Sequence, residues 1–289
     1  MRVETHSFFK SVKAPAKLNI VLKITGRREN GYHDLASVMV AVNLCDQLEL
    51  APGPPGIISL TSFGHQVPDN ENNIVIKAAT AFLSQTDINL GLSIKLTKNI
   101  PVAAGLGGGS SDAASVLKSL NEIFDNPLSD QELALMAVGL GADVPFFLKS
   151  RPSIARGIGE ILEPIENWPQ FWYVIITPPF MVSTSWVYSK LKLELTTQEY
   201  SNILQKLQKR PFDIMNILEN DLESVVCLHY PVIEGIKKYL LKTGSEGALM
   251  SGSGPSVFGI FKSKDKAMQA KRYLVSQHLG FIVAVEGII

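Results

Sequence analysis

The stretch from Gly105 to Ser111 contains four glycines and two serines, and a segment with helical periodicity follows it directly. Glycine lets the backbone adopt positive φ and approach a ligand without a Cβ clash. The first turn of a helix offers unpaired N–H groups and the positive end of its dipole to an anion. This combination predicts a phosphate-binding loop. The alternative is a flexible Gly/Ser linker, but linkers rarely run straight into an amphipathic helix.

The loop fits neither of the two common phosphate-binding motifs. A Walker loop requires a lysine after its last glycine, and no lysine follows Gly109. The dinucleotide fingerprint requires a glycine three residues after Gly107, where this chain has Ser110. The helix after the loop is patterned from Ala113 onward, because its apolar residues recur along one face of a 3.6-residue period. These residues are Leu117, Leu120, Ile123 and Phe124.

The N-terminal segment is predicted to form a β-hairpin. Strand-like residues at 12–14, 18–25 and 35–44 flank a turn at 27–31. The turn ends in Asn-Gly, two residues that tolerate positive φ, so its chemistry agrees with the strands on either side.

Three polar residues of this hairpin are candidates for chemistry, and each has a bland alternative. Lys17 lies on a strand, where a lone lysine is more often a solvated surface charge. Asn19 follows two residues later and could be an ordinary polar residue at a strand edge. His33 comes directly after the turn, where a histidine is often a structural hydrogen-bonding residue.

A carboxylate follows the second predicted helix. That helix begins at Ser129, which forms the pattern of a capping box with Glu132, and the glycines at 139 and 141 are expected to end it. Pro145 is expected to prevent the helix from resuming, so Asp143 is predicted to lie on a bend that enters a strand over 146–148. The alternative role for Asp143 is an Asx turn that closes the helix.

The rest of the chain alternates helices and strands. A change to prolines and tryptophan near residues 164–169 predicts two lobes, residues 1–165 and 166–289. Residues 250–256 form a turn of small residues, which would let a ligand or another backbone approach closely or would simply connect two strands. The expected helices are 73–85, 183–191, 196–208, 221–228, 232–242 and 263–277, and the expected strands are 57–60, 90–98, 172–177, 247–250, 256–261 and 281–285, with a hairpin over 154–163.

Composition excludes several classes of protein. The 289 residues are 46% hydrophobic, enough for a large buried core, and 27 basic residues balance 27 acidic ones. The formal net charge is therefore zero, and it does not favour nucleic acid or an anionic membrane as a binding partner. Cys45 and Cys227 have no paired spacing and suit free thiols in a reducing compartment, so we expect a cytoplasmic protein. The chain has no apolar run of membrane-spanning length, and its five histidines lack metal-ligand spacing.

The sequence from Pro101 to Ala114 resembles the phosphate loop of the GHMP kinases, the family of galactose, homoserine, mevalonate and phosphomevalonate kinases. The other landmarks of that family occur in the expected order, namely the lysine-bearing strand at 15–22 and the small-residue turn at 250–259. The resemblance implies an α+β fold with an N-terminal lobe like domain 2 of ribosomal protein S5 and a ferredoxin-like C-terminal lobe. It also implies an ATP-dependent transfer of phosphate to an alcohol.

The resemblance assigns the catalytic residues. Asp143 would be the general base that accepts the proton of the attacking hydroxyl. Lys17 would hold Asp143 ionised and stabilise negative charge on that hydroxyl. Asn19 would orient the acceptor.

The nucleotide would be ATP, with Mg²⁺ held chiefly by phosphate oxygens and water, so no protein ligand for the metal is predicted. Ser110 and Ser111 would add hydroxyl donors to the backbone amides, and Asp112 is expected to cap the following helix. The whole predicted nucleotide site comprises Pro101, Val102, Ala103, Ala104, Gly105, Leu106, Gly107, Gly108, Gly109, Ser110, Ser111 and Asp112.

The motif Gly-Tyr-His at 31–33 and the long glycine run point, by resemblance, to family members whose small-molecule substrate carries a cytidine diphosphate moiety. Tyr32 would stack on the cytosine, His33 would read its Watson–Crick edge, and Tyr188 would close the other face. Tyr188 follows a segment that departs from the proline-containing version of some relatives. Other expected substrate contacts are Thr184, Gly252, Ser253 and Gly254.

Three rival functions remain at this point. One is another small-molecule GHMP kinase, of the homoserine or phosphomevalonate type. A second is a catalytically silent ligand sensor with this fold, against which the presence of both Lys17 and Asp143 argues. A third is an RNA-binding module, which the balanced charge disfavours. We expect no nucleic acid or membrane partner, and a monomer or a weak homodimer.

Overall fold

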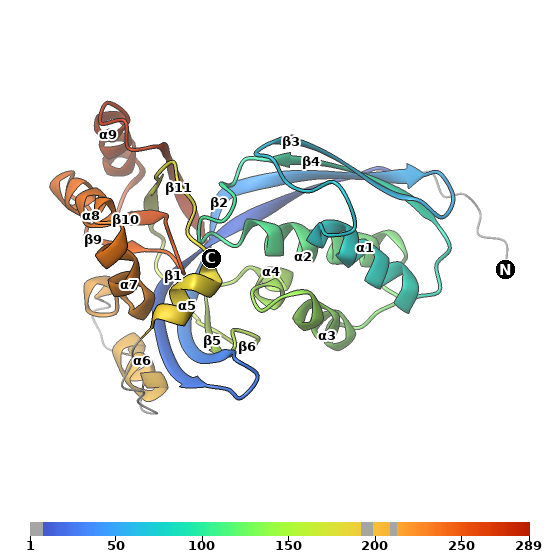
Figure 1. Ribbon diagram of the computed structural model, residues 1–289, viewed down its shortest axis with the longest axis horizontal. Helices are drawn as coiled ribbons and strands as arrows, with labels where there is room; N and C mark the ends of the chain where they lie inside the picture. The colour runs from blue at the N-terminus through green and yellow to red at the C-terminus, as the bar shows by residue number, and fades with distance from the viewer. Residues whose placement is uncertain (1–7, 192–198, 209–212) are drawn as a thin grey trace. The chain divides into compact units, whose positions relative to one another are not determined.

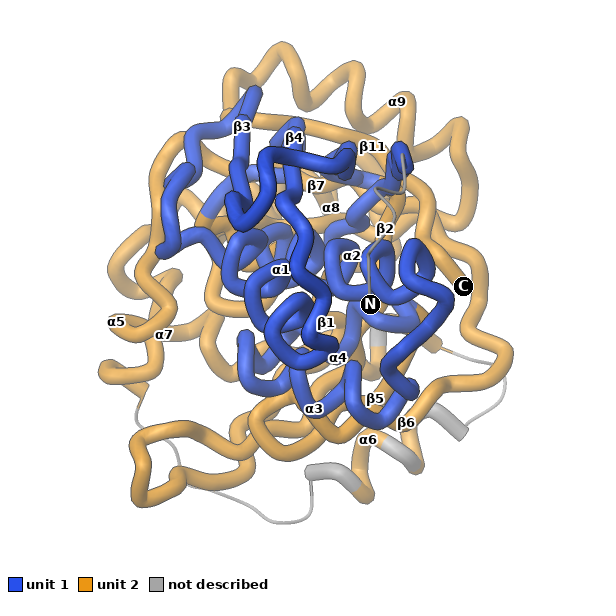
Figure 2. The backbone as a smooth tube through the Cα atoms, turned by 90° about the vertical axis from the view of Figure 1, so that its right-hand side faces the viewer, with its two compact units in different colours: residues 1–16, 44–102, 107–150 blue, residues 17–43, 103–106, 151–289 orange. Residues whose placement is uncertain are grey.

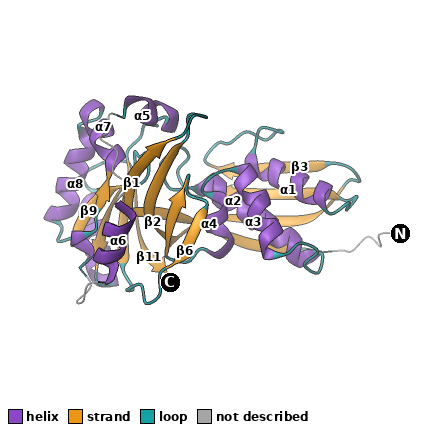
Figure 3. Cartoon of the chain, turned by 90° about the horizontal axis from the view of Figure 1, so that it is seen from below, coloured by secondary structure: helices purple, strands orange, loops and turns teal. Residues whose placement is uncertain are grey.

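The structure is a computed structural model that describes residues 8–191, 199–208 and 213–289. The chain divides into two compact units, drawn in different colours in Figure 2. Unit 1 comprises residues 1–16, 44–102 and 107–150, and unit 2 comprises residues 17–43, 103–106 and 151–289. Both units mix helices and strands (Figure 3), so the α+β class expected from the sequence is confirmed.

Unit 1 has a sheet with helices against one face (Figure 1). Strand β4 (Gly91–Lys98) lies at the centre, parallel to β3 (Ile58–Gly64) and antiparallel to residues 47–53 of β2 (His33–Gly53). The helices α1 (Ile74–Gln85), α2 (Gly108–Ile123), α3 (Asp130–Leu140) and α4 (Val144–Lys149) pack on one another, and α2 contacts the other three. The buried faces of these elements form the core of the unit.

Unit 2 is built on an antiparallel sheet in the order β11, β7, β10, β9. Helices α8 and α9 pack on this sheet, and Leu22 and Ile24 of β1 join the same apolar core. The strands are β7 (Trp172–Thr177), β9 (Gly247–Met250), β10 (Val257–Phe261) and β11 (Phe281–Ile288), and the helices are α5 (Thr184–Lys190), α6 (Glu199–Gln208), α7 (Asp221–His229), α8 (Val232–Lys242) and α9 (Lys264–Val275).

The predicted N-terminal hairpin is present in unit 2. Strand β1 (Lys10–Arg27) pairs with β2, and β2 in turn pairs with β5 (Ser153–Gly157) through residues 35–39 and with β11 at residues 41–42. The hairpin of β5 and β6 (Ile161–Pro164) is also confirmed.

Two short elements were not predicted. The strand β8 (Glu219–Asn220) pairs in parallel with Val21 and Leu22, and a 3₁₀ turn covers Ile214–Asn216. Part of the helix predicted over 196–208 lies outside the described residues, which include it from Glu199.

Two predicted elements are wrong. Helix α2 begins at Gly108 and not near Ala113. The prediction placed the start too late because it relied on apolar residues that recur along one helical face, and glycine and serine add none. The strand predicted over 146–148 is helix α4, in which proline occupies the first turn. Proline lacks an N–H and has a fixed φ, so it is tolerated there although it would break a helix interior.

The division at residue 165 predicted from composition remains a prediction about domains, since the compact units group residues by contact and interleave along the chain. No helix among the described residues is both long and apolar enough to cross a membrane.

Candidate active site

The predicted phosphate loop enters α2 with positive φ at alternate residues. The φ angles are 51° at Ala103, 74° at Gly105 and 70° at Gly107. Gly107 is the N-cap residue of α2, and no side chain caps that helix. Backbone N–H groups that follow such a turn point to one side and form a concave site for an anion.

The start of α2 differs in this respect from five other helices of the chain. A side-chain oxygen accepts a hydrogen bond from the first turn of α1, α3, α5, α7 and α9, and these caps are Asn73, Ser129, Ser183, Asn220 and Ser263. The capping box expected at Ser129 is confirmed, including the reciprocal hydrogen bond that the Ser129 N–H donates to Glu132 Oε2. At α2, glycine takes the place of the capping residue, which leaves the first-turn amides without a side-chain partner.

The members of the loop differ in exposure. Gly109 is exposed, and Gly107, Gly108 and Ser110 are partly buried. Pro101, Ala104 and Leu106 are buried and therefore contribute packing, whereas Val102 and Ala103 are exposed. Ser111 is fully buried, and its Oγ has no hydrogen-bond partner among the described residues. Ser110 is thus the more accessible of the two predicted hydroxyl donors.

Asp112 does not cap α2, which corrects the role expected for it. The helix begins four residues before Asp112, so this side chain lies inside the helix and not at its end. It is buried, and its Oδ2 accepts a hydrogen bond of 2.8 Å from Lys98 Nζ. Lys98 was not singled out in the sequence.

The small-residue turn over residues 251–256 holds the loop from within unit 2. Ser251 Oγ donates to the carbonyl oxygen of Gly105 at 3.0 Å. The N–H of Ser256 donates to the carbonyl oxygen of Ala104 at 3.3 Å. A Cβ at Gly105 would lie 2.1 Å from the carbonyl oxygen of Ser251. Only glycine allows the two backbones to come this close.

Asn220 shapes this turn and was missed by the sequence reading. Its Nδ2 donates to the carbonyl oxygens of Met250 and Gly252, each at 2.8 Å, while its Oδ1 accepts from the N–H of Leu222 to cap α7. The one signal in the sequence was an asparagine directly before a predicted helix, which indicates a cap but not a long-range contact.

The predicted catalytic lysine is buried on β1, with 5% of its surface exposed. Lys17 Nζ donates to Asn19 Oδ1 at 2.5 Å, and Asn19 Nδ2 donates to Ser37 Oγ at 2.8 Å. The backbone N–H of Lys17 donates to the carbonyl oxygen of Leu106 in the phosphate loop at 2.9 Å. The structure therefore brings Lys17, Asn19 and the loop together and rules out a solvated lysine.

Asp143 precedes α4 as its N-cap residue, with φ −85° and ψ −14°, and its side chain does not cap the helix. It is partly buried. Asp143 belongs to unit 1 and Lys17 to unit 2, so their predicted pairing remains a prediction.

Two of the three predicted cytosine-binding residues meet in unit 2. The rings of His33 and Tyr188 have centroids 5.0 Å apart and an angle of 34° between their planes. Tyr32 is 56% exposed. Burial, and to a lesser degree the positive charge of Arg27, lower the pKa of His33, so its imidazole is neutral at neutral pH.

Helix α5 links this aromatic pair to the small-residue turn. It carries Tyr188, and at its first residue the hydroxyl of Thr184 lies 2.8 Å from that of Ser253. A third predicted contact, Gly252, has φ 55° and lies against Asn19, whose Oδ1 would be 3.2 Å from an added Cβ. The predicted substrate residues of the second half therefore lie around one turn and one helix.

The described residues contain no group of three or more His, Cys, Asp or Glu side chains placed to hold a metal ion. Cys45 and Cys227 are both free thiols.

Comparisons with known proteins agree with the geometry. The family model for the GHMP kinases N terminal domain matches residues 73–151, and that for the GHMP kinases C terminal matches residues 201–279. The 4-diphosphocytidyl-2-C-methyl-D-erythritol kinase of Geobacter metallireducens is 43% identical over 279 residues, which cover 96% of this chain and 99% of that protein.

Solved structures show the same fold. The crystal structure of a 4-(cytidine 5'-diphospho)-2C-methyl-D-erythritol kinase matches with a TM-score of 0.81 and 34% identity, covering 96% of this chain and 99% of the other. A homoserine kinase from Cytophaga hutchinsonii matches over the full length of both chains, with a TM-score of 0.77 but only 19% identity, so it supports the fold alone. The chain belongs to the GHMP kinases and, within them, to the family of the 4-diphosphocytidyl-2-C-methyl-D-erythritol kinases.

Proposed function

We propose that this chain transfers the γ-phosphoryl group of ATP to the C2 hydroxyl of 4-diphosphocytidyl-2-C-methyl-D-erythritol, in the non-mevalonate pathway to isoprenoid precursors. The assignment of the nucleotide site rests mainly on the start of α2, which has no side-chain cap and follows a turn with positive φ angles. Phosphoryl transfer needs mainly alignment and charge stabilisation, which a loop of backbone amides supplies.

In this proposal Asp143 accepts the proton of the C2 hydroxyl as the new P–O bond forms, and the P–O bond to ADP breaks. Lys17 stabilises the oxygen that gains negative charge. Asn19 fixes the ammonium of Lys17, as their 2.5 Å hydrogen bond supports. This assigns Asn19 to the orientation of Lys17, while its predicted contact with the acceptor remains open to test.

Mg²⁺ fits this site as a companion of the nucleotide and not as a resident ion. We expect phosphate oxygens and water to supply most of its ligands, because Mg²⁺ dehydrates reluctantly and is rarely held by an all-protein site. Bound in that way, the metal would neutralise charge on the β- and γ-phosphates. The half-buried Ser110 is the accessible hydroxyl that would bond to the phosphates.

The cytidine end of the substrate would lie at His33, with Tyr32 and Tyr188 as the stacking rings. A neutral imidazole has one N–H donor and one acceptor, and the Watson–Crick edge of cytosine offers the amino group as donor and ring acceptors beside it. The depressed pKa of His33 supports this role because it keeps the ring neutral.

An ADP-release assay over a panel of acceptor alcohols tests the proposal. We expect turnover with 4-diphosphocytidyl-2-C-methyl-D-erythritol and at most a trace with homoserine or phosphomevalonate. Preferred turnover of either rival acceptor would refute the substrate assignment but keep the kinase. ATP binding without turnover of any acceptor would favour the ligand sensor.

Location and assembly complete the proposal. Free thiols at both cysteines support a cytoplasmic enzyme. A monomer or weak homodimer is what we expect by size-exclusion chromatography with light scattering.

A further inference from the structure

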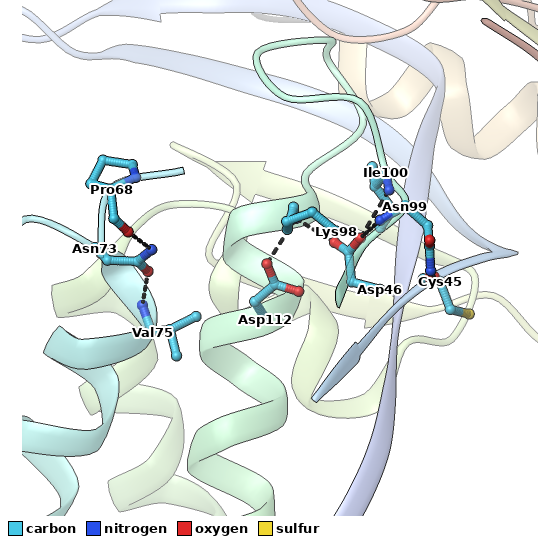
Figure 4. Close-up of polar contacts among 9 residues, drawn as sticks. All are labelled: Cys45, Asp46, Pro68, Asn73, Val75, Lys98, Asn99, Ile100 and Asp112. Atoms are coloured by element: carbon cyan, nitrogen blue, oxygen red, sulfur yellow. Dashed lines mark hydrogen bonds and ion pairs between the residues drawn. The ribbon is translucent and has the colours of Figure 1, made fainter. Parts of the chain in front are cut away.

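Three charged side chains meet in the interior of unit 1 (Figure 4). Lys98 ends β4, Asp46 lies on β2 and Asp112 lies on α2, and they are 3%, 0% and 2% exposed. Lys98 Nζ bonds to Asp46 Oδ2 and, at 2.8 Å, to Asp112 Oδ2. Such residues are almost never fully buried unless they are paired, so the cluster needs an explanation.

The charges of this cluster do not balance if every group is ionised. One ammonium faces two carboxylates, which leaves one negative charge in a buried region where water cannot screen it. The simplest way to neutralise the cluster is one proton on a carboxylate.

The hydrogen bonds show which carboxylate holds that proton. Asp46 Oδ1 accepts two backbone N–H groups, from Asn99 at 2.7 Å and from Ile100 at 2.8 Å, and both bonds favour its ionised form. Asp112 Oδ2 accepts from Lys98 and also contacts the Asp46 carboxylate, which raises the pKa of Asp112, while its Oδ1 has no partner among the described residues. The proton therefore belongs on Asp112.

The cluster lies directly against the first turn of α2. A Cβ at Gly108 would be 3.0 Å from Lys98 Nζ and 3.0 Å from Ile100 Cγ2. Asp46 in turn fixes the backbone at Ile100. The three charged residues thus join β2, β4 and the start of the helix whose amides are proposed to bind the nucleotide.

We propose that Asp46, Lys98 and Asp112 are positioning residues for the nucleotide, which hold the first turn of α2 in place as a cluster neutralised by one proton on Asp112. The inference rests on the proposed nucleotide site at that turn. The negative charge of a nucleotide bound at the first turn of α2 makes ionised Asp112 less favourable. Molecules in which Asp112 has lost its proton should therefore take one up when the nucleotide binds.

The other charged groups on the elements around Asp112 do not neutralise the extra negative charge of the cluster. Glu49 and Lys95 of β2 and β4 pair with each other at 3.3 Å. Asp143, before α4, is partly buried. The charged residues of α1, α3 and α4 are exposed, and they are Lys77, Asp130, Glu132 and Lys149; on α2 itself Lys118 and Glu122 are exposed.

The titration of Asp112 gives the pH window for a test. Burial, reinforced by Asp46 and opposed by Lys98, raises the pKa of Asp112 from 3.8 to about 8. Below pH 7 Asp112 already holds its proton, and binding takes up none. Near pH 8.5 the free protein has lost most of this proton, and bound nucleotide restores it because it raises the pKa further.

Isothermal titration calorimetry of Mg-ADP in two buffers of different ionisation enthalpy measures this proton uptake directly. For the wild type we expect an uptake near zero at pH 6.5 and several tenths of a proton per ADP at pH 8.5, both relative to Asp112→Asn. If binding raises the pKa by about one unit, Kd at pH 8.5 is about threefold weaker than for Asp112→Asn.

Two matched variants separate a charge effect from a packing effect. Asp112→Asn and Asp46→Asn each leave one lysine with one carboxylate and keep the side-chain shape. Both should bind Mg-ADP without proton uptake at pH 8.5, with folding checked by circular dichroism. Asp130→Asn removes an exposed carboxylate of the same unit and should keep the wild-type uptake.

Equal proton uptake by the wild type and Asp112→Asn would overturn the inference, as would full uptake by Asp46→Asn. If Asp46→Asn fails to fold, the comparison with Asp112→Asn decides alone. Failure of the wild type to bind Mg-ADP at any pH would overturn the nucleotide site and this inference with it, whereas binding without proton linkage would overturn the inference only.

Discussion

Replacing Gly105 by alanine adds one methyl group at the point where the phosphate loop rests on the small-residue turn. The new Cβ would lie 2.1 Å from the carbonyl oxygen of Ser251, whereas ordinary contacts begin at 3.4 Å, so the backbones must separate by about 1.3 Å. The residue would also have to keep a φ of 74°, which an L side chain disfavours.

The expected loss of stability follows from these two effects. A left-handed conformation costs about 1–2 kcal/mol for a residue with a Cβ. Overpacking against a fixed backbone adds about 1–3 kcal/mol. The sum of roughly 2–5 kcal/mol corresponds to a fall in Tm on the order of 3–8 °C for a protein of this size.

Differential scanning calorimetry and ATP kinetics test this prediction together. Gly105→Ala should lower Tm and raise KM for ATP, since the bond from Ser251 Oγ to the loop at Gly105 would stretch with the displacement. Gly139→Ala is the matched control, because nothing lies within 4 Å of its added Cβ inside α3. That variant should gain about 0.5–1 kcal/mol from helix propensity and leave KM unchanged. A Tm within about 2 °C of wild type for Gly105→Ala, with unchanged KM, would refute the close seating of the loop.

Four residues of the proposed site and its supporting turn can each be tested by a separate change. Asp143→Asn should lower kcat by a factor of about 10² or more and leave the Kd of ATP nearly unchanged, because only the proton acceptor is lost. Tyr32→Ala should raise KM for the cytidine substrate with little change in Tm, since the ring is 56% exposed. The KM for that substrate should rise on acidification only below the ordinary histidine pKa of 6.5, because His33 must stay neutral and its pKa is lowered. Asn220→Ala should lower the free energy of unfolding by about 2–4 kcal/mol, since one amide makes three hydrogen bonds.

Each of these has an outcome that contradicts it. Turnover unchanged in Asp143→Asn removes that residue from the chemistry. An effect of Tyr32→Ala confined to ATP kinetics shows that the cytidine site is assigned wrongly, and a KM that is flat below pH 6.5 in the wild type does the same for His33. Asn220→Asp keeps the cap on α7 but cannot donate to the two turn carbonyls, so a stability equal to wild type would show that those bonds are unimportant.

The sequence predicted the fold well wherever side-chain patterns follow backbone geometry. The capping box at Ser129 and the hairpin around residue 30 both rest on local rules and are confirmed. The start of α2 was missed because glycine and serine have no apolar side chain to mark a helical face. Pro145 misled for a different reason, since the effect of a proline depends on whether it begins a helix or interrupts one.

The contacts within the candidate site could be foreseen in part because its motifs are contiguous. Lys17, the loop and the small-residue turn could each be recognised locally, and the contacts of unit 2 join them. Lys98 and Asp46 are 52 residues apart and carry no motif, so only the fold reveals their pairing. Asn220 is a similar case, since its amide reaches a turn about 30 residues away.

The interleaving of the two units along the chain bears on how the gene can be divided. Strand β1 passes from unit 1 to unit 2 at Lys17, and β2 returns to unit 1 at Leu44. A fragment that ends near residue 165 would carry residues 17–43 away from the sheet core in which Leu22 and Ile24 are buried. A chimera with a relative's C-terminal half should therefore take residues 17–43 from that same relative, because these strands and the later sheet share one apolar interior.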